Sequence, residues 1–241
     1  MNIHHLSHSS VQTFQGCPRR WSYKQAGVEV ERTPVVLAFG VAVHDGAAAK
    51  SERAFTGCGP ADVGQTTFAG TWDSMAAAKA APLHLGSASA DELRVLGHKL
   101  IDVYEPPSRL LGVEQPVEIR LADDLPPIHG RVDLLYQDEG GGLVVADLKT
   151  SCTRVISDTA SVEAQLSLYS EAFPGRLEAI VLAKLKTPVA TVQPITPWPR
   201  ERLVNLYRET YAAMKAGVRY AVRSTTMCPS CPYRDRCERD H

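Results

Sequence analysis

The run LVVADLK at 143–149 limits the possible folds more than any other segment of this chain. It is rich in β-branched residues and mostly apolar, a pattern typical of a strand buried on both faces of a sheet. The tract DEGGG at 138–142 predicts a tight turn before it, and IHGRVDLLYQ at 128–137 has the pattern of the preceding strand. We therefore expect two adjacent strands of one sheet, with residues 143–149 near its centre.

Further strands and helices are predicted on both sides of this pair. After Pro106–Pro107 the predicted strands are 113–121, 177–186 and 189–195, and the predicted helices are 159–173 and 199–222. Before it, the predicted helices are 9–26 with a break near Gly16–Pro18, 38–54, 65–81 and 89–104, with a loop at 56–64 and the small-residue run Gly86–Ser89 before the last helix. This order of elements predicts an α/β fold in which helices flank a central mixed sheet.

The length and the order of elements favour a single domain. A chain of 241 residues buries a substantial core. We expect an N-terminal helical region over 1–105, a core over 106–222 and a cysteine-rich loop over 223–241.

The overall charge does not identify a partner. The net charge is −1, and the hydrophobic and charged fractions of 44% and 22% are ordinary for a soluble globular protein. Residues 176–241 hold twelve Lys and Arg against six Asp and Glu. This basic portion is compatible with a phosphate backbone and equally with solvated helix faces. The chain has no G-x-x-x-x-G-K loop, so no recognisable NTPase motor is expected.

The N-terminal residues MNIHHLSHSS lack the basic and apolar regions of a secretory signal. No run approaches the roughly 18 apolar residues that a membrane span needs. We therefore expect a cytoplasmic protein without a membrane partner. Because cysteines stay reduced in that compartment, the six cysteines are better interpreted as metal ligands or buried thiols than as disulfides.

Four of the cysteines form a candidate ligand set that joins the two ends of the chain. Cys228, Cys231 and Cys237 have the spacing C-x2-C-x5-C, and Cys17 is the natural fourth ligand. Two thiolates three residues apart reach one metal because a tight turn aims both sulfurs the same way. Such a site would stabilise the fold, since metal-binding free energy becomes folding free energy.

The spacing leaves the identity of the bound group open. Four thiolates suit a zinc ion and a [4Fe–4S] cluster about equally well. A zinc ribbon usually has two C-x2-C pairs, whereas here one cysteine lies more than 200 residues before the other three. Cys58, in a glycine-rich loop, and Cys152, just after the central strand, are expected to be inert small residues.

A second constellation lies on the two central strands. Asp133 belongs to GRVDLL, and Asp147 and Lys149 belong to ADLKTS, so the last two project from the same face of their strand. Two carboxylates beside one lysine can bind Mg²⁺ or Mn²⁺ and place a cation against a phosphate. A surface ion pair is the ordinary alternative. Because Asp147 ends an apolar run, its carboxylate is costly to bury without a partner, which favours the metal site.

Two predicted helices carry residues that fit the same site. Gly40 and His44 form G-x-x-x-H within 38–54, where a packed or solvated histidine is the commoner interpretation. Gln165 and Tyr169 form Q-x-x-x-Y within 159–173, where the i, i+4 spacing places both on one helix face. An ordinary amphipathic helix would also have this spacing.

Taken in order, G-x-x-x-H, G-R-V-D, D-L-K-T-S and Q-x-x-x-Y resemble the motif series of the RecB-like PD-(D/E)XK nucleases. Cys17 with the terminal C-x2-C-x5-C is similar to the iron–sulfur variant of that series. This variant occurs in the AddB-type helicase–nuclease subunit and in CRISPR-associated RecB-like nucleases. The resemblance extends from Cys17 to Cys237. It departs from the family in one place, where the D-x-K motif has Asp147 instead of the commoner glutamate.

The resemblance implies a restriction-endonuclease-like core and a set of metal ligands. His44, Asp133 and Asp147 would bind the catalytic Mg²⁺ or Mn²⁺, together with the Leu148 carbonyl oxygen. Glu114, at the start of the first strand, would add a carboxylate directly or through water.

The resemblance also implies roles for the remaining motif residues. Lys149 would orient the attacking water and offset charge in the transition state. Gln165 and Tyr169 would hold the lysine region and the DNA strand. For the four cysteines, the resemblance favours a [4Fe–4S] cluster over zinc.

The activity that follows is metal-dependent hydrolysis of DNA by an exonuclease acting on single strands or strand ends, in phage or bacterial recombination or repair. One alternative is a CRISPR-associated nuclease that processes DNA for spacer acquisition. An alternative of another class is an inactive DNA-binding module with a structural iron–sulfur or zinc site, and a further one is a zinc-stapled interaction protein. A helicase, a recombinase or CRISPR adaptation proteins would be the corresponding partners.

Overall fold

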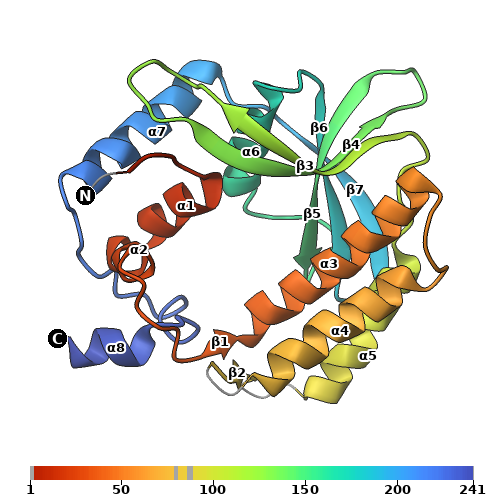
Figure 1. Cartoon of the computed structure of the whole chain (residues 1–241), viewed down its shortest axis with the longest axis horizontal. Coiled ribbons are helices and arrows are strands. Elements are labelled where there is room, and N and C mark those ends of the chain that lie inside the picture. Colours follow the sequence, from red (N-terminus) through yellow and green to blue (C-terminus); the bar gives the residue numbers. More distant parts are fainter. Residues whose placement is uncertain (1–2, 79–80, 86–88, 241) are drawn as a thin grey trace.

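A five-stranded mixed sheet forms the centre of the computed structural model, which describes residues 3–78, 81–85 and 89–240 (Figure 1). The strands lie in the order of the sequence: β3 Leu110–Ile119, β4 Ile128–Gln137, β5 Leu143–Ser151, β6 Arg176–Ala183 and β7 Val189–Ile195. Within this sheet β5 and β6 pair in parallel, and the other neighbours are antiparallel. The α/β class, the mixed sheet and the central position of β5 are confirmed.

The sequence of β5 explains its central position. Val144, Val145 and Ala146 are fully buried, with Val145 in one hydrophobic cluster and its two neighbours in the other. Both faces of the strand are therefore covered, as its apolar run predicts. A parallel neighbour requires a crossover, and helix α6 (Ala160–Ser170) lies in the connection from β5 to β6.

Helices cover the two faces of the sheet. On one face α3 (Val35–Thr56), α4 (Val63–Ala77) and α5 (Ala90–Val103) pack together, and on the other lie α1 (His8–Gly16), α2 (Pro18–Gln25), α6 and α7 (Arg200–Lys215) (Figure 1). The break predicted near Gly16–Pro18 separates α1 from α2, since Pro18 begins the second helix. The expected helix at 38–54 lies within α3. No helix of the described residues is long and apolar enough to cross a membrane.

Several expected boundaries were wrong. The helix expected over 199–222 ends at Lys215, because Gly217 has a left-handed φ of 73° and its N–H bonds to the Met214 carbonyl. Residues 234–239, expected as loop, form the short helix α8 (Arg234–Arg239).

Two small strands were not predicted. β1 (Thr33–Pro34) and β2 (Leu83–His84) pair in parallel before α3 and α5. The helix expected over 65–81 stops at Ala77, and residues 79–80 lie outside the described residues, as do 86–88 of the small-residue run.

Candidate active site

The site forms where strands β4 and β5 separate, beside the paired strands β3 and β4. Leu134 pairs with Ala146, and no later pair joins β4 to β5 within the described residues. Beyond that pair the Asp133 carboxylate accepts a hydrogen bond of 2.7 Å from the Leu148 backbone N–H. The side chain therefore occupies the place that a backbone carbonyl would have taken. It also holds the two strands at a defined separation.

The regular alternation of side chains between the two faces of the sheet is interrupted at Asp133 and Glu114. The register of β3 and β4 places Glu114 opposite Asp133. Val132 packs in the cluster on the α6 side and Leu134 in the cluster on the α3 side, although residues two apart in a strand normally share a face. Glu114 has a φ of 49°, a conformation that costs a non-glycine residue roughly 1–2 kcal/mol. This local strain aims a carboxylate out of the regular pleat.

Helix α3 brings His44 against these carboxylates. Its Nε2 lies 3.1 Å from Asp133 Oδ2 and 3.5 Å from Glu114 Oε1, and the three ligand atoms lie within 4.8 Å of one another. Arg131 contacts the other oxygen of Glu114 at 3.0 Å. Burial lowers the pKa of His44, but its hydrogen bond to Asp133 and the nearby carboxylate charges outweigh this and raise the pKa to about 9. The carboxylate charges therefore give the site a negative electrostatic potential at His44.

Asp147 and Lys149 form an ion pair beside this group. Asp147 is only 2% exposed, and its Oδ2 lies 2.7 Å from Lys149 Nζ. Burial raises the pKa of Asp147 despite the opposing charge of Lys149. Gln165 Oε1 accepts a hydrogen bond of 3.4 Å from the same ammonium group. The prediction that Asp147 and Lys149 share a strand face therefore holds in the structure.

Tyr169 stands one helical turn from Gln165 and packs against β4. A Cβ atom at Gly130 would lie 2.6 Å from Tyr169 Cε1, so only glycine allows this approach. The glycine of the GRVD motif thus lets α6 approach the strand that carries Asp133. The need for glycine at position 130 was not predicted, although the sequence shows Gly130 three residues before Asp133.

The residues at this site fit a divalent cation. The buried Glu114 Oε1 accepts no hydrogen bond from the described part of the chain, and the buried Asp147 Oδ2 contacts the Lys149 ammonium group. Carboxylates with one imidazole are a ligand set that suits Mn²⁺. Mg²⁺ prefers oxygen ligands, so the carboxylates of the same set suit it as well. Glu114, expected only as an accessory, lies in the tight group with His44 and Asp133, whereas Asp147 lies outside it.

The four predicted cysteines line a separate cavity of about 570 Å³ where the chain ends meet. Cys17 lies between α1 and α2, Cys228 and Cys231 precede α8, and Cys237 lies within it. All four are half-buried, whereas the other two cysteines are exposed. Burial raises the pKa of Cys231 and of Cys237. Among the residues that the structure describes, no three of these sulfurs lie within 4.8 Å of one another.

The cavity lies between segments from both ends of the chain. The Arg19 N–H donates to the Tyr220 carbonyl at 3.1 Å, and Tyr23 donates to Asp240 at 2.6 Å. Glu31 accepts a hydrogen bond of 3.1 Å from the Arg236 N–H. The predicted proximity of the first and last segments is therefore present, and these polar contacts hold the segments together.

Comparisons with known proteins agree with this arrangement. Residues 5–238 match the PD-(D/E)XK nuclease superfamily. A crystal structure from Eubacterium rectale, of a protein described as a "putative exonuclease", has a TM-score of 0.51 at 10% identity and covers 88% of this chain and 79% of that one. The crystal structure of SSO0001 has a TM-score of 0.47 at 15% identity, covering 100% and 89%. No curated protein matches. Because the family match spans almost the whole chain, the protein belongs to the PD-(D/E)XK nuclease superfamily.

Proposed function

We propose that this nuclease is a divalent-metal-dependent deoxyribonuclease of the RecB-like branch that removes nucleotides from single strands or strand ends. The observation that carries the proposal is the group of His44, Glu114 and Asp133, whose ligand atoms lie within 4.8 Å of one another. Asp147 and Lys149 stand beside it on the next strand. Carboxylates next to a lysine serve phosphodiester hydrolysis, because one part binds cations and the other offsets phosphate charge.

His44, Glu114, Asp133 and Asp147 would hold the cation, with the Leu148 carbonyl as a backbone ligand. A bound Mg²⁺ or Mn²⁺ lowers the pKa of water and draws charge from phosphate oxygens. The hydrogen bond from the Leu148 N–H fixes the Asp133 carboxylate, and the strained backbone at Glu114 aims the second carboxylate at His44. The ligand set is thus organised by the chain itself, which limits the reorganisation needed on binding.

Lys149 would place its ammonium group against the scissile phosphate. Asp147 and Gln165 contact this group at 2.7 and 3.4 Å and restrict its position. Tyr169 packs against Gly130 and keeps α6, which carries Gln165, close to the sheet. Gln165 and Tyr169 therefore act as positioning residues for the lysine.

We further propose that Cys17, Cys228, Cys231 and Cys237 hold a [4Fe–4S] cluster. Four thiolates around one zinc with bonds of about 2.3 Å would lie about 3.8 Å apart. A cluster spreads its thiolates over four irons and needs wider spacing. All four cysteines line one cavity of about 570 Å³, which supports a shared bound group, and the resemblance to the iron–sulfur variant favours the cluster.

Recombination or repair is the cellular role that we propose. A nuclease for spacer acquisition would use the same site and differ in its partner proteins. The inactive DNA-binding module is disfavoured because the described chain has the carboxylates, the histidine and the lysine together at one site.

End-labelled single-stranded, double-stranded and circular single-stranded DNA, each with Mg²⁺, Mn²⁺ or EDTA, test the proposal. We expect digestion of linear DNA in Mn²⁺ or Mg²⁺, none in EDTA, and survival of the circle. Asp133→Asn, which is close in size, serves as the inactive control. Cleavage of the circle would contradict the exonuclease assignment, and full activity in EDTA would contradict metal dependence.

A further inference from the structure

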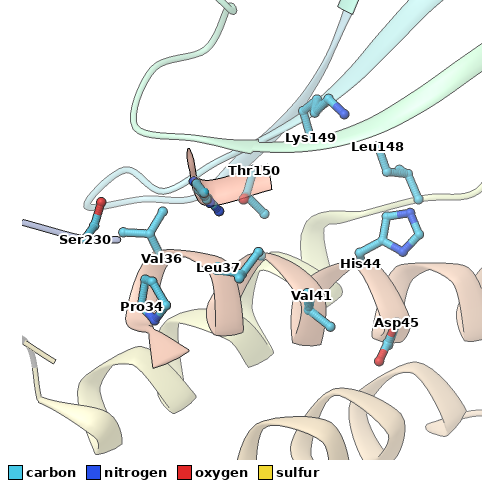
Figure 2. Close-up of a pocket in the computed structure, with 12 residues that line it drawn as sticks. Pro34, Val36, Leu37, Val41, His44, Asp45, Leu148, Lys149, Thr150 and Ser230 are labelled. Carbon is cyan, nitrogen blue, oxygen red and sulfur yellow. The ribbon is translucent and has the colours of Figure 1, made fainter. Parts of the chain in front are cut away.

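A groove of about 550 Å³ begins at the candidate active site and follows the first turns of α3. Figure 2 shows His44 at one end and Ser230, from the cysteine-bearing segment, at the other. Val36, Leu37 and Val41 lie along α3 between these ends (Figure 2). The groove therefore connects the active site to the region that holds the cysteines.

The α3 wall of the groove is apolar and open to solvent. Val36 is 67% exposed and Leu37 is 52% exposed, although both belong to the first turn of the helix. Neighbouring exposed aliphatic side chains beside a charged site indicate a binding surface more than a packing surface. Side chains of this kind pack against nucleic-acid bases, whose faces are apolar.

Arg20 lines the same groove and also lines the cysteine cavity. Within the described residues its guanidinium makes no ion pair with a carboxylate, whereas Arg32, Arg236 and Arg239 nearby each have one. A half-buried arginine without a carboxylate partner is suited to a phosphate, which its guanidinium can hold with two parallel hydrogen bonds. Together with Lys149, it gives the groove a second positive charge.

The opposite wall is the free edge of β5. Because the last β4–β5 backbone pair is Leu134 with Ala146, residues 148–150 make no backbone pair with β4 in the described structure. Across from this edge, a Cβ atom at Gly40 would meet only Thr150 Oγ1, at 3.6 Å. A Cβ atom at Gly40 would therefore fit the fold, and a longer side chain would extend beside Thr150 into the groove.

We propose that this groove binds one strand of single-stranded DNA, with bases against Val36 and Leu37 and a backbone phosphate at Arg20. The inference rests on the proposed nuclease function and deepens it, since it gives the strand a path from Lys149 toward Ser230. The volume of about 550 Å³ lies within the 300–1,000 Å³ typical of small-ligand sites, which is enough for nucleotide-sized units.

Binding of a fluorescein-labelled single-stranded oligonucleotide of mixed sequence, measured by anisotropy without divalent cations over a range of salt concentrations, tests the phosphate contact. Each phosphate contact to a single strand contributes a slope of about −0.7 to the dependence of log K on log salt concentration. Arg20→Gln is expected to lose one such contact and to weaken binding. Arg19→Gln is the matched control, because Arg19 is the adjacent arginine of α2 and lines only the cysteine cavity. Equal slopes for wild type and Arg20→Gln would overturn the phosphate contact.

Gly40→Leu tests the path itself. We expect it to fold normally, since leucine favours helices, and to lower kcat/KM on single-stranded DNA in Mn²⁺ by about tenfold or more through displaced substrate. Gly70→Leu is the matched control, because Gly70 lies in α4 and a Cβ atom added there would have nothing within 4 Å. Thermal melting of both variants shows whether they are folded. If Gly40→Leu is folded and as active as Gly70→Leu, the groove does not carry the strand.

These experiments separate the two proposals. Wild-type protein that binds the oligonucleotide through Arg20 but cleaves no DNA in Mn²⁺ would contradict the nuclease activity and support the groove. Wild-type protein that cleaves DNA, with no effect of Arg20→Gln or Gly40→Leu, would contradict the groove alone. A wild-type protein that neither binds nor cleaves would contradict both.

Discussion

The carboxylate site and the cysteine cavity are built in opposite ways. The carboxylate site takes most of its residues from three consecutive strands, so their register and one backbone hydrogen bond position Asp133. The cysteine cavity joins Cys17 to residues more than 200 positions later, and contacts between the chain ends hold it. The fold itself therefore positions the residues of the first region, whereas the second region gains most stability from a bound group. Substitutions in the carboxylate site should remove activity and leave the fold intact. Substitutions in the cysteine cavity should lower the stability of the fold and leave the chemistry of the site intact.

The largest expected effect is on catalysis at the sheet. Asp133→Ala, Asp147→Ala and Lys149→Ala should each lower cleavage by roughly a thousandfold or more, because a ligand or a charge in the transition state is lost. End-labelled DNA in saturating Mn²⁺ measures the rate, and circular dichroism checks the fold. A variant of any of the three that keeps the wild-type rate would remove that residue from the mechanism.

A large effect on stability is expected at the cysteines. Protein purified without oxygen should be brown with about four irons per chain, as a four-thiolate cluster requires. Cys17→Ser should bleach it and lower Tm by about 10 °C, since a few kcal/mol shifts a chain of this size by that amount. Cys58→Ser and Cys152→Ser are the controls, because both residues are exposed and lie outside the cavity.

The cysteine variants also test the contrast between the two regions. At a temperature where Cys17→Ser remains folded, its cleavage rate should stay within a few-fold of the wild-type rate. A colourless wild-type protein with one zinc per chain would overturn the cluster and leave the nuclease proposal intact. Complete loss of cleavage in folded Cys17→Ser would instead make the cavity part of the catalytic machinery.

A smaller effect is expected at the imidazole ligand. His44→Ala should raise the Mn²⁺ concentration needed for half-maximal activity by about tenfold, because a neutral ligand contributes less than a carboxylate to holding a hard cation. The maximal rate at saturating metal should fall less than in Asp133→Ala. Metal titration of the cleavage rate provides the measurement. An unchanged metal requirement would return His44 to the role of a packing residue.

The last expected effect is on stability alone and concerns His8, which is 5% exposed and whose Nδ1 lies 3.0 Å from the Tyr207 hydroxyl. Burial, with a contribution from the charge of Lys149, lowers the pKa of His8 from 6.5 to about 4. Above pH 6.5 both the folded and the unfolded chain hold it neutral. As the pH falls from 6.5 to 4 the unfolded chain gains the proton first, so stability falls by up to roughly 3 kcal/mol.

Urea unfolding between pH 4 and 7 measures this loss. His8→Gln cannot take up the proton, so its stability should depend less steeply on pH over this interval. The two slopes are compared, since the substitution also changes the contact with Tyr207. Equal slopes in the two proteins would mean that His8 is not buried as a neutral group.

The sheet and most of its site follow from local sequence patterns. The bounds of β4 were predicted to the residue, because alternation ends at a strong turn, and β5 was recognised from its continuous apolar run. The end of α7 was missed because the apolar residues at 218–222 continue a helical pattern, whereas Gly217 ends the helix by its backbone conformation. Helix α8 was missed because prolines and cysteines dominate the sequence around it.

The features of the site that were not predicted depend on packing between distant segments. Glutamate rarely adopts a left-handed backbone, so the residue type at position 114 does not predict this conformation. The conformation places the Glu114 carboxylate, expected only as an accessory ligand, in the group with His44. Arg20 lines the groove only because α2 packs near the start of α3 and the end of β5. Motif spacing predicts which side chains share a strand face, but not which helix lies across from them.

Diffraction from crystals soaked in Mn²⁺, recorded at the manganese absorption edge, tests the central claim most directly, because it locates the cation independently of activity. The account predicts the strongest anomalous peak between His44 Nε2 and the carboxylates of Glu114 and Asp133, about 2.0–2.3 Å from each ligating atom. The same peak should be absent from Asp133→Ala crystals. A peak elsewhere, or none at this position in wild-type crystals that cleave DNA, would contradict the claim.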